Sequence, residues 1–190
     1  MRVMIDACVL YPTVMREVLL GCAEAGLFAP RWSSRILEEW ARAAAKLGPE
    51  NEIWARGEIA ALRASFPQGE VQYDAGLEQR YWLPDPSDIH VLTAAVAGSC
   101  DGILTMNAKD FPRNVLGDEA LLRWDPDGFA LILLAEAPDQ VRGVARRVLD
   151  EANRLSEDPW TMRALMKKAR MPRFGKALEA STPAMPGGDR

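Results

Sequence analysis

The sequence is poor in the residues that mark secreted, zinc-binding or membrane-spanning proteins. Its three cysteines, Cys8, Cys22 and Cys100, form no CxxC pair, and His90 is the single histidine. A scattered, odd set of cysteines argues against a disulfide framework and for a reducing cytosol, and so little histidine and cysteine makes a zinc site improbable. No apolar run approaches the ~20 residues that a membrane span needs, and the N-terminus shows no signal-peptide pattern. We therefore expect a cytoplasmic protein without a membrane segment.

The sequence also lacks an overall excess of positive charge, but its charges are unevenly distributed. The net charge is −4 over 190 residues. Residues 1–158 hold 16 basic and 25 acidic side chains, whereas residues 159–176 hold six basic side chains and no acid. Such asymmetry suggests an anionic partner for the basic segment, although a solvated helix face explains the charges equally well. The length suits one domain with an appendage, or two small domains.

Short apolar runs alternate with helical patterns over the first two thirds of the chain. This alternation predicts an α/β fold with a central parallel sheet covered by helices on both faces. The expected strands are Val3–Ile5, Leu27–Ala29, Glu70–Tyr73, Gly102–Thr105 and Ala120–Trp124. The expected helices between them are Pro12–Glu24, a helix capped by Ser33 or Ser34, Glu50–Ser65 and Ser87–Ala97.

After residue 127 the pattern is helical throughout, with helices expected at Gly128–Glu136, Pro138–Arg154 and Pro159–Ala169. We divide the chain accordingly into an α/β domain at 1–130, a helical extension with the basic segment at 131–180, and a disordered tail at 181–190.

Two aspartates occupy positions that favour a site. Asp6 follows a buried strand, and sites in parallel sheets lie beyond the carboxyl ends of the strands. Asp88 shares a helix stripe with Leu92 and Ala95, whereas His90 points away from that stripe. A buried carboxylate is costly unless it is paired, hydrogen-bonded or bound to a metal. The alternatives are a turn residue or a helix cap at Asp6. At Asp88 the alternative is a first-turn acid favoured by the helix dipole, with Asp85 or Ser87 as the N-cap.

A glutamate pair and a polar loop add further candidates. Glu38 and Glu39 flank the apolar stripe of their helix on opposite sides, and the Arg42 partner of Glu38 tilts the choice towards Glu39 as the inward residue. Thr105, Asn107 and Asp110 follow the expected strand at Gly102–Thr105. Carboxylates that converge at one sheet edge require a cation, and hard oxygen ligands select Mg²⁺ or Mn²⁺. The chemistry this favours is phosphodiester hydrolysis.

Four segments in this order resemble the PIN-domain family, and within it the VapC-type toxins of bacterial toxin–antitoxin pairs. The segments are Met4–Leu10, Ser33–Trp40, Asp85–Ala95 and Ile103–Pro112. The resemblance covers roughly residues 1–130 and implies a three-layer α/β/α fold; the rest looks like the C-terminal helical extension of a longer VapC-like subgroup. It also implies an endoribonuclease that uses Mg²⁺ or Mn²⁺, is inhibited by a small antitoxin protein, and is commonly dimeric.

The resemblance also assigns roles to individual residues. It makes Asp6, Glu39, Asp88 and Asp110 the catalytic set. Asp6, Asp88 and Asn107 are the metal ligands, with one tightly held ion expected. Asn107 stands where the family frequently has aspartate, so either Asn107 or Asp110 fills the fourth acidic position. In-line attack would leave 5′-phosphate and 3′-hydroxyl ends.

RNA would be held by a phosphate-orienting hydroxyl and by the basic segment. The candidates are Thr105, Arg163, Lys167, Lys168, Arg170 and Arg173. The same cations would serve equally to bind an acidic antitoxin tail or to pack on the protein's own acidic body.

Two other readings compete with the nuclease. A catalytically inactive PIN-like module that binds RNA or protein is favoured by Asn107. The other is a phosphatase or receiver-type α/β domain with an aspartate after the first strand. A haloacid-dehalogenase-type phosphatase would need a second aspartate where Cys8 stands, and a receiver would need an adjacent acid pair before Asp6, which is absent.

Overall fold

A computed structural model describes residues 1–180 of the chain. Its centre is a sheet of four parallel strands in the order β2-β1-β3-β4. The strands are β1 (Arg2–Ile5), β2 (Ala29–Arg31), β3 (Gly102–Leu104) and β4 (Leu122–Trp124). Their residues are almost wholly buried in β1 and β3, as expected for the inner strands of a covered parallel sheet. The predicted α/β class and parallel sheet are confirmed.

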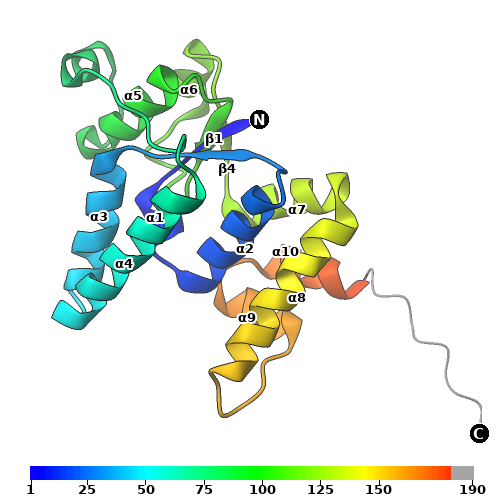
Figure 1. Cartoon of the computed structure of the whole chain (residues 1–190). Coiled ribbons are helices and arrows are strands. Elements are labelled where there is room, and N and C mark those ends of the chain that lie inside the picture. The colour runs from blue at the N-terminus through cyan, green and yellow to red at the C-terminus, as the bar shows by residue number, and fades with distance from the viewer. Residues whose placement is uncertain (181–190) are drawn as a thin grey trace, which may run out of the picture.

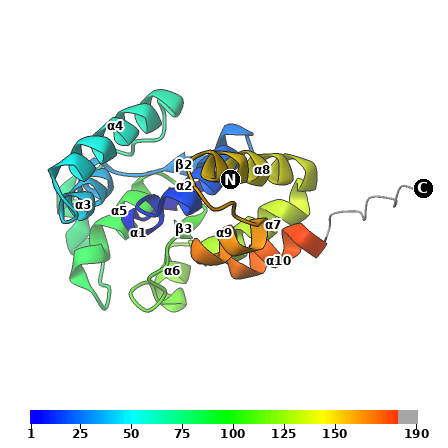
Figure 2. The same ribbon diagram turned by 90° about the horizontal axis from the view of Figure 1, so that it is seen from below.

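Helices cover both faces of the sheet (Figure 1). The N-terminal helices are α1 (Ala7–Leu10), α2 (Thr13–Glu24), α3 (Ser34–Ala45), α4 (Pro49–Ser65) and α5 (Ile89–Ala97), with 3₁₀ turns η1 (Ala75–Arg80) and η2 (Pro86–Asp88). The C-terminal helices are α6 (Arg113–Asp118), α7 (Pro126–Glu136), α8 (Pro138–Arg154), α9 (Met162–Lys168) and α10 (Pro172–Ala180). Seen from below, α3, α4 and α5 lie on one side of the strands, and α7 to α10 on the other (Figure 2).

Local signals account for most helix ends. The Ser33 hydroxyl accepts the Ile36 amide and caps α3. At the end of α2, the Gly26 amide donates to Ala23 and the Leu27 amide to Cys22, and Gly26 has a φ of 80°. This is a Schellman ending, which requires a left-handed residue that glycine adopts at little cost. Because the Leu27 amide donates to the end of α2 in this motif, Leu27 cannot pair in the sheet, and β2 begins two residues later than predicted.

Other expected elements differ from the structure. The strand expected at Glu70–Tyr73 is wrong, because Glu70 makes only an isolated bridge with Trp32. Several short elements, α1, η1, α6 and α10, were not predicted, since one or two turns leave too little periodicity to recognise. The prediction for 181–190 lies outside the described residues. None of the helices within residues 1–180 combines the length and hydropathy that a bilayer crossing requires.

The hydrophobic core is continuous from β1 to α10. It includes Val3 and Ile103 of the sheet as well as Val141 and Phe174 of the C-terminal helices. The expected boundary between residues 1–130 and 131–180 falls inside α7, and the division into domains stays a prediction. Helices α7 to α10 pack mainly on one another and on α2, which places them beside the α/β layers.

Candidate active site

The sheet changes winding direction between β1 and β3. From β1 the chain crosses to β2 on one side, and β3 then joins β1 on the other side. Side chains that follow the carboxyl ends of β1 and β3 therefore meet at a topological switch point, where parallel sheets leave a crevice. Asp6 follows β1 and Thr105 follows β3, and both are buried. Asp6 and Thr105 were both predicted as site residues, and the structure places them side by side.

Asp6 is held from two sides by hydrogen bonds to one carboxylate oxygen. Thr105 Oγ1 donates to Asp6 Oδ2 over 2.6 Å, and Cys8 Sγ donates to the same oxygen over 3.1 Å. Thr105 Oγ1 in turn accepts the amide of Asn107 at 2.9 Å. Thr105 thus orients Asp6, one of the predicted metal ligands, and the loop after β3. Its predicted contact with a phosphate stays a prediction.

Three aspartates gather beside this pair. Asp85, Asp88 and Asp110 each offer a carboxylate oxygen, and these oxygens lie within 4.8 Å of one another. The Asn107 side-chain amide donates to Asp88 Oδ2 at 3.3 Å. Asp88, Asn107 and Asp110, which were predicted from separate segments, are therefore neighbours. Asp85 is an addition that the sequence reading treated as a helix cap, and its position three residues before Asp88 was the available signal.

The electrostatics of this cluster are unfavourable without a cation. Burial raises the pKa of Asp88 to about 6, and repulsion from Asp6, Asp85 and Asp110 adds to that effect. Because the charge of Asp6 contributes to the raised pKa of Asp88, the Asp6 carboxylate lies close enough to interact with the cluster. The donors are carboxylate and amide oxygens, a hard set that fits Mg²⁺ or Mn²⁺. A divalent cation would remove the repulsion that the cluster builds up.

The loop that carries Asn107 and Asp110 is fixed from β4. One nitrogen of Arg123, Nη1, donates to the carbonyl of Phe111 at 2.6 Å and also to the carbonyl of Ala108. The Asp110 amide closes the turn by donating to the Asn107 carbonyl at 3.1 Å. Arg123 was not singled out in the sequence, because nothing local links β4 to a loop twelve residues earlier. It is a positioning residue for this part of the site.

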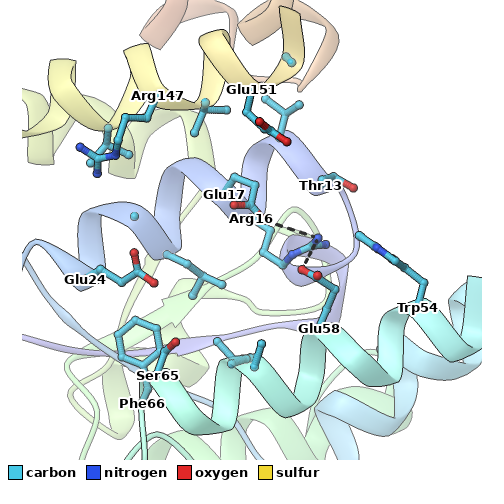
Figure 3. A pocket seen from close by; sticks show the side chains of 18 of the residues that line it. Thr13, Arg16, Glu17, Glu24, Trp54, Glu58, Ser65, Phe66, Arg147 and Glu151 are labelled. Carbon is cyan, nitrogen blue, oxygen red and sulfur yellow. Dashed lines mark hydrogen bonds and ion pairs between the residues drawn. The ribbon is translucent and has the colours of Figure 1, made fainter. Parts of the chain in front are cut away.

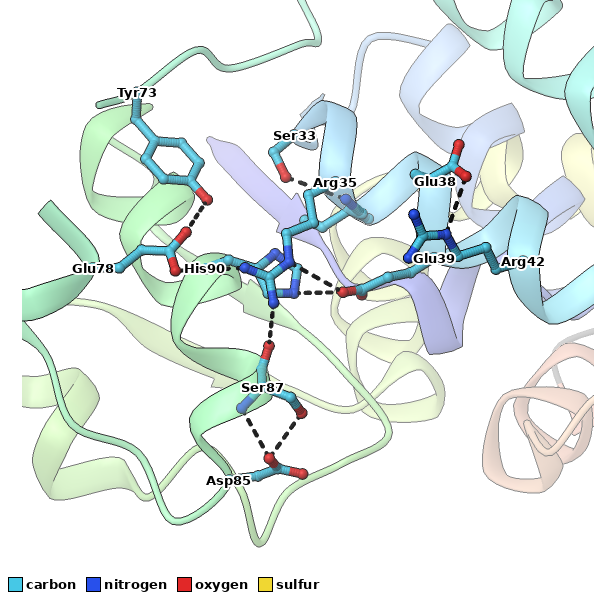
Figure 4. A network of polar contacts seen from close by, with 11 residues as sticks. Ser33, Arg35, Glu38, Glu39, Arg42, Tyr73, Glu78, Asp85, Ser87 and His90 are labelled. Carbon is cyan, nitrogen blue, oxygen red and sulfur yellow. Dashed lines mark hydrogen bonds and ion pairs between the residues drawn. The ribbon is translucent and has the colours of Figure 1, made fainter. Parts of the chain in front are cut away.

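Glu39 lies in a different set of contacts. Its Oε1 is 2.9 Å from His90 Nε2 and 3.5 Å from Arg35 Nε. Figure 4 shows both side chains turned toward Glu39. His90 is 1% exposed, and its Nε2 lies beside the Glu39 carboxylate without an aligned hydrogen bond. His90 was placed away from the stripe of Asp88, Leu92 and Ala95. It is nevertheless buried, because α5 is buried on nearly all sides from His90 to Ala95.

The same network joins α3 to the segment that carries Asp88. Arg35 donates to Glu78 at 3.5 Å and to the Ser87 carbonyl at 3.4 Å. The Ser87 amide and hydroxyl both donate to Asp85 (Figure 4). Glu39 and Asp88 are therefore connected through Arg35 and Ser87. Among the described residues, the group of three clustered acids does not include Glu39.

The pairing of Glu38 agrees with the sequence reading. Glu38 forms ion pairs with Arg42 at 3.1 Å and with Arg56 at 3.2 Å. Its carboxylate therefore lies on the surface, away from the other predicted site residues. Glu39, whose partners are Arg35 and the buried His90, is the glutamate that faces α5.

The basic C-terminal candidates divide into two groups. Arg173 binds the protein's own acids, with Nε 3.0 Å from Asp127 and Nη2 2.8 Å from Asp125. Arg163 forms a longer pair with Glu179 at 3.7 Å. Within residues 1–180, Lys167, Lys168 and Arg170 have no ion pair and are exposed. Arg173 is thus bound by acids of the same chain, whereas Lys167, Lys168 and Arg170 are free to contact a partner.

Comparison with known proteins supports the same family. A sequence profile described as PIN domain matches residues 2–109. No curated protein sequence is similar enough to count as a match, and the same holds for solved structures. The matched segment covers more than half of the chain and contains Asp6, Glu39, Asp85, Asp88 and Asn107. Asp110 and Arg123 follow the end of the match.

Proposed function

The chain belongs to the PIN-domain family, and from that premise we propose that it is a metal-dependent endoribonuclease. We further propose that it acts in the cytoplasm as the toxin of a type II toxin–antitoxin pair. PIN domains are generally nucleases. The observation that carries the nuclease proposal is the convergence of Asp85, Asp88 and Asp110 at the edge of the sheet where Asp6 lies. The toxin role, the antitoxin and a homodimer rest on the resemblance to VapC-type proteins.

Asp6, Asp88 and Asn107 are the residues that would hold Mg²⁺ or Mn²⁺, with Asp85 and Asp110 completing the oxygen set. The chemistry that such an ion supplies is Lewis acidity, which activates water and neutralises charge on the phosphate. Thr105 and Cys8 keep Asp6 in one orientation, which reduces the reorganisation needed when an ion binds. Asn107 also donates to Asp88, so the site combines donors and acceptors around the same carboxylates.

Glu39 is the candidate for placing the attacking water. Its contacts with His90 and Arg35 fix the carboxylate on α3 at a position linked to η2, the turn that carries Asp88. A carboxylate fixed beside, and not within, the aspartate cluster suits hydrogen bonding to water. Attack in line with the leaving ribose oxygen would produce 5′-phosphate and 3′-hydroxyl ends.

Contacts with the RNA backbone are proposed for the exposed cations Lys167, Lys168 and Arg170, with Arg163 as a weaker member. Such contacts would be salt-dependent, because phosphate binding releases counterions. Arg173 is less suited to this role, since its guanidinium already binds Asp125 and Asp127.

Incubation with total RNA tests the proposal. The chain, purified without any partner, should cut RNA in the presence of Mn²⁺ and not after chelation, and ligation-based sequencing should find 5′-phosphates at the new ends. Asp6→Asn should abolish cutting while leaving the thermal unfolding midpoint nearly unchanged. Asp118→Asn, an exposed acid on α6, is the matched control and should cut normally. Mn²⁺ binding without cleavage of any RNA would favour the inactive module instead.

A further inference from the structure

A small pocket between α8 and α10 shares no residue with the candidate active site. It has a volume of about 220 Å³, and α8 contributes Arg142, Arg146 and Leu149 to its lining. These residues lie on the side of α8 opposite to Val144 and Glu151, which line the larger groove shown in Figure 3. α10 packs mainly on α9 and α7, so the space between α8 and α10 stays open.

Gly143 also lines this pocket, although packing does not require a glycine there. Within the described part of the chain, the only atom within 4 Å of an added Cβ would be Arg147 Nη1, at 3.9 Å. At Gly175 of α10, by contrast, an added Cβ would lie 2.8 Å from Met166 Cβ, so close packing requires that glycine. A glycine inside a helix destabilises it relative to alanine. Gly143 therefore weakens α8 and keeps this side of the helix open to the pocket.

The two arginines of the pocket are poorly neutralised by the chain's own acids. Arg142 and Arg146 are one helical turn apart, and like charges at this spacing repel each other. Arg142 Nη1 is 3.7 Å from Asp139, whose side chain is 100% exposed, so this pair is weak. Arg142 Nε is buried and has no hydrogen-bond partner among residues 1–180. In the same part of the chain, the exposed Arg146 forms no ion pair, not even with Asp150 four residues later.

The opposite wall of the pocket is apolar except for one acid. Met162 of α9 and Leu178 of α10 line it, together with Glu179. Glu179 Oε2 lies 3.7 Å from Arg163 Nη1, and Arg163 is outside the lining. Because Arg163 balances Glu179, the charge of Arg146 and the unused donors of Arg142 determine what the pocket attracts.

Three features of this pocket act against the stability of the chain: an unneeded glycine in a helix, two neighbouring like charges and a buried donor without a partner. Natural proteins tolerate such local conflicts mainly at functional sites. Guanidinium groups bind phosphate oxygens bidentately, and a phosphate monoester offers three acceptor oxygens to two such groups. A carboxylate offers only two. The volume is below the ~300–1,000 Å³ of pockets that enclose a drug-sized ligand, so this pocket suits a phosphate with one attached ring.

We propose that the pocket between α8 and α10 binds the phosphate monoester and the sugar of a single nucleotide. Arg142 and Arg146 donate to the phosphate, the sugar lies against Leu149 and Met162, and Gly143 leaves room between the arginines. A free mononucleotide and the phosphorylated 5′ end of an RNA strand both carry this group. The proposal does not depend on nuclease activity, because no residue of the pocket belongs to the aspartate site.

Calorimetric titration of the full chain with ribose 5-phosphate tests the proposal. The sugar phosphate should bind at least about tenfold more tightly than ribonate, a sugar acid of similar size with a carboxylate. Arg146→Gln should weaken binding by about tenfold, because it removes charged donors. Arg154→Gln, a paired position on the same helix, is the matched control and should not. Gly143→Leu should abolish binding by filling the pocket, without lowering the thermal unfolding midpoint, since leucine is a better helix former than glycine.

Competition experiments with metal chelated separate the two sources of the phosphate. If the pocket takes RNA ends, an oligonucleotide with a 5′-phosphate should displace ribose 5-phosphate, and the same oligonucleotide with a 5′-hydroxyl should not. If it takes a free nucleotide, adenosine monophosphate should displace the sugar phosphate and neither oligonucleotide should.

Three results would overturn the proposal. The first is the absence of saturable binding of ribose 5-phosphate up to about 10 mM. The second is equal binding of ribonate, which would remove the argument for a phosphate. The third is unchanged binding by both Arg146→Gln and Gly143→Leu, because the ligand would then bind elsewhere. None of these measurements involves RNA cleavage, so the nuclease proposal keeps its own test.

Discussion

Two aspartates, the buried Asp127 and the half-buried Asp88, lie in different halves of the molecule and have opposite environments. Asp127 lies in α7 and accepts the amides of Arg173 and Phe174 at 3.1 and 2.8 Å, and Arg173 Nε at 3.0 Å. Asp88 accepts one side-chain amide, from Asn107 at 3.3 Å, and faces three other carboxylates.

The difference separates an acid that serves the fold from an acid that we propose serves chemistry. Asp127 satisfies the first amides of α10, which would otherwise lack partners, and it sits at the positive end of that helix. Asp88 makes the folded state less stable than a neutral residue would. Natural proteins tolerate such local conflicts mainly at functional sites.

The largest effect on stability is expected from Asp127→Ala. The substitution leaves two helix amides, one of them buried, without an acceptor and removes one of the two carboxylates that bind the Arg173 guanidinium. It should lower the free energy of unfolding by about 3 kcal/mol. For a chain of this size the unfolding midpoint should fall by about 6–12 °C. Thermal unfolding monitored by circular dichroism measures the change. Asp158→Ala, at an exposed position, is the control, and an equally small loss in both variants would mean that Asp127 is not a structural anchor.

The next largest effect concerns the loop at the active site. Arg123→Gln removes the donor that holds the carbonyls of Ala108 and Phe111, so Asn107 and Asp110 should lose their fixed position. We expect Mn²⁺ affinity to fall by about tenfold, as for other residues that orient metal ligands. Titration of the Mn²⁺ electron paramagnetic resonance signal gives the affinity directly. Arg113→Gln, on the nearby α6, should bind Mn²⁺ as the unmodified chain does; if Arg123→Gln also does, the loop is held by other contacts.

A smaller effect links Asp88 to pH. The pKa of Asp88 is about 6 in the folded chain, above the ordinary 3.8, so the folded state holds its proton more tightly than the unfolded state does. Protonation of Asp88 therefore stabilises the folded state. This contribution is complete below about pH 4 and is lost as the pH rises through 6. With metal chelated, Asp88→Asn should therefore be more stable than the unmodified chain at pH 8, by about 1 kcal/mol after allowance for solvent screening. The two should unfold alike at pH 4, and a constant difference at both pH values would contradict the assignment.

The smallest effect is expected on the exposed C-terminal cations. If Lys167 and Lys168 contact phosphates, Lys167→Gln/Lys168→Gln should reduce the slope of log affinity against log salt by about 1–2. Binding of a labelled single-stranded RNA to the Asp6→Asn chain at several salt concentrations measures this slope without cleavage. Arg42→Gln/Arg154→Gln removes the same charge from paired surface positions and should leave the slope unchanged. Identical slopes for both variants would assign the lysines to another partner.

Much of the fold followed from local patterns. The ends of α2, α3 and α8 were predicted within a few residues, because Gly26, Ser33 and Pro138 each act on the backbone beside them. The strand β2 was displaced because the Schellman ending of α2 takes up Leu27. Strand ends within a covered sheet depend on neighbouring strands, which no local pattern records.

The candidate site was predictable in its residue types and less so in its contacts. Asp6 and Thr105 could be placed at the sheet edge because the carboxyl ends of parallel strands share that edge. The pairing of Glu39 with His90 was missed, since helical periodicity places a side chain on a face of its own helix without saying what covers that face. The link from Arg123 to the loop after β3 joins two segments whose neighbourhood arises only when β3 and β4 pair.

By itself the sequence determined the alternation of the four strands with the longer helices, the caps at Gly26 and Ser33, and the presence of acids after β1 and before α5. Those features depend on interactions between residues a few positions apart. The tertiary structure alone decided that Asp85 joins Asp88 and Asp110, and that Arg173 binds Asp127 while Lys167 stays exposed. Charges act through space over several ångströms, so their partners are set by how distant segments pack and not by their spacing along the chain.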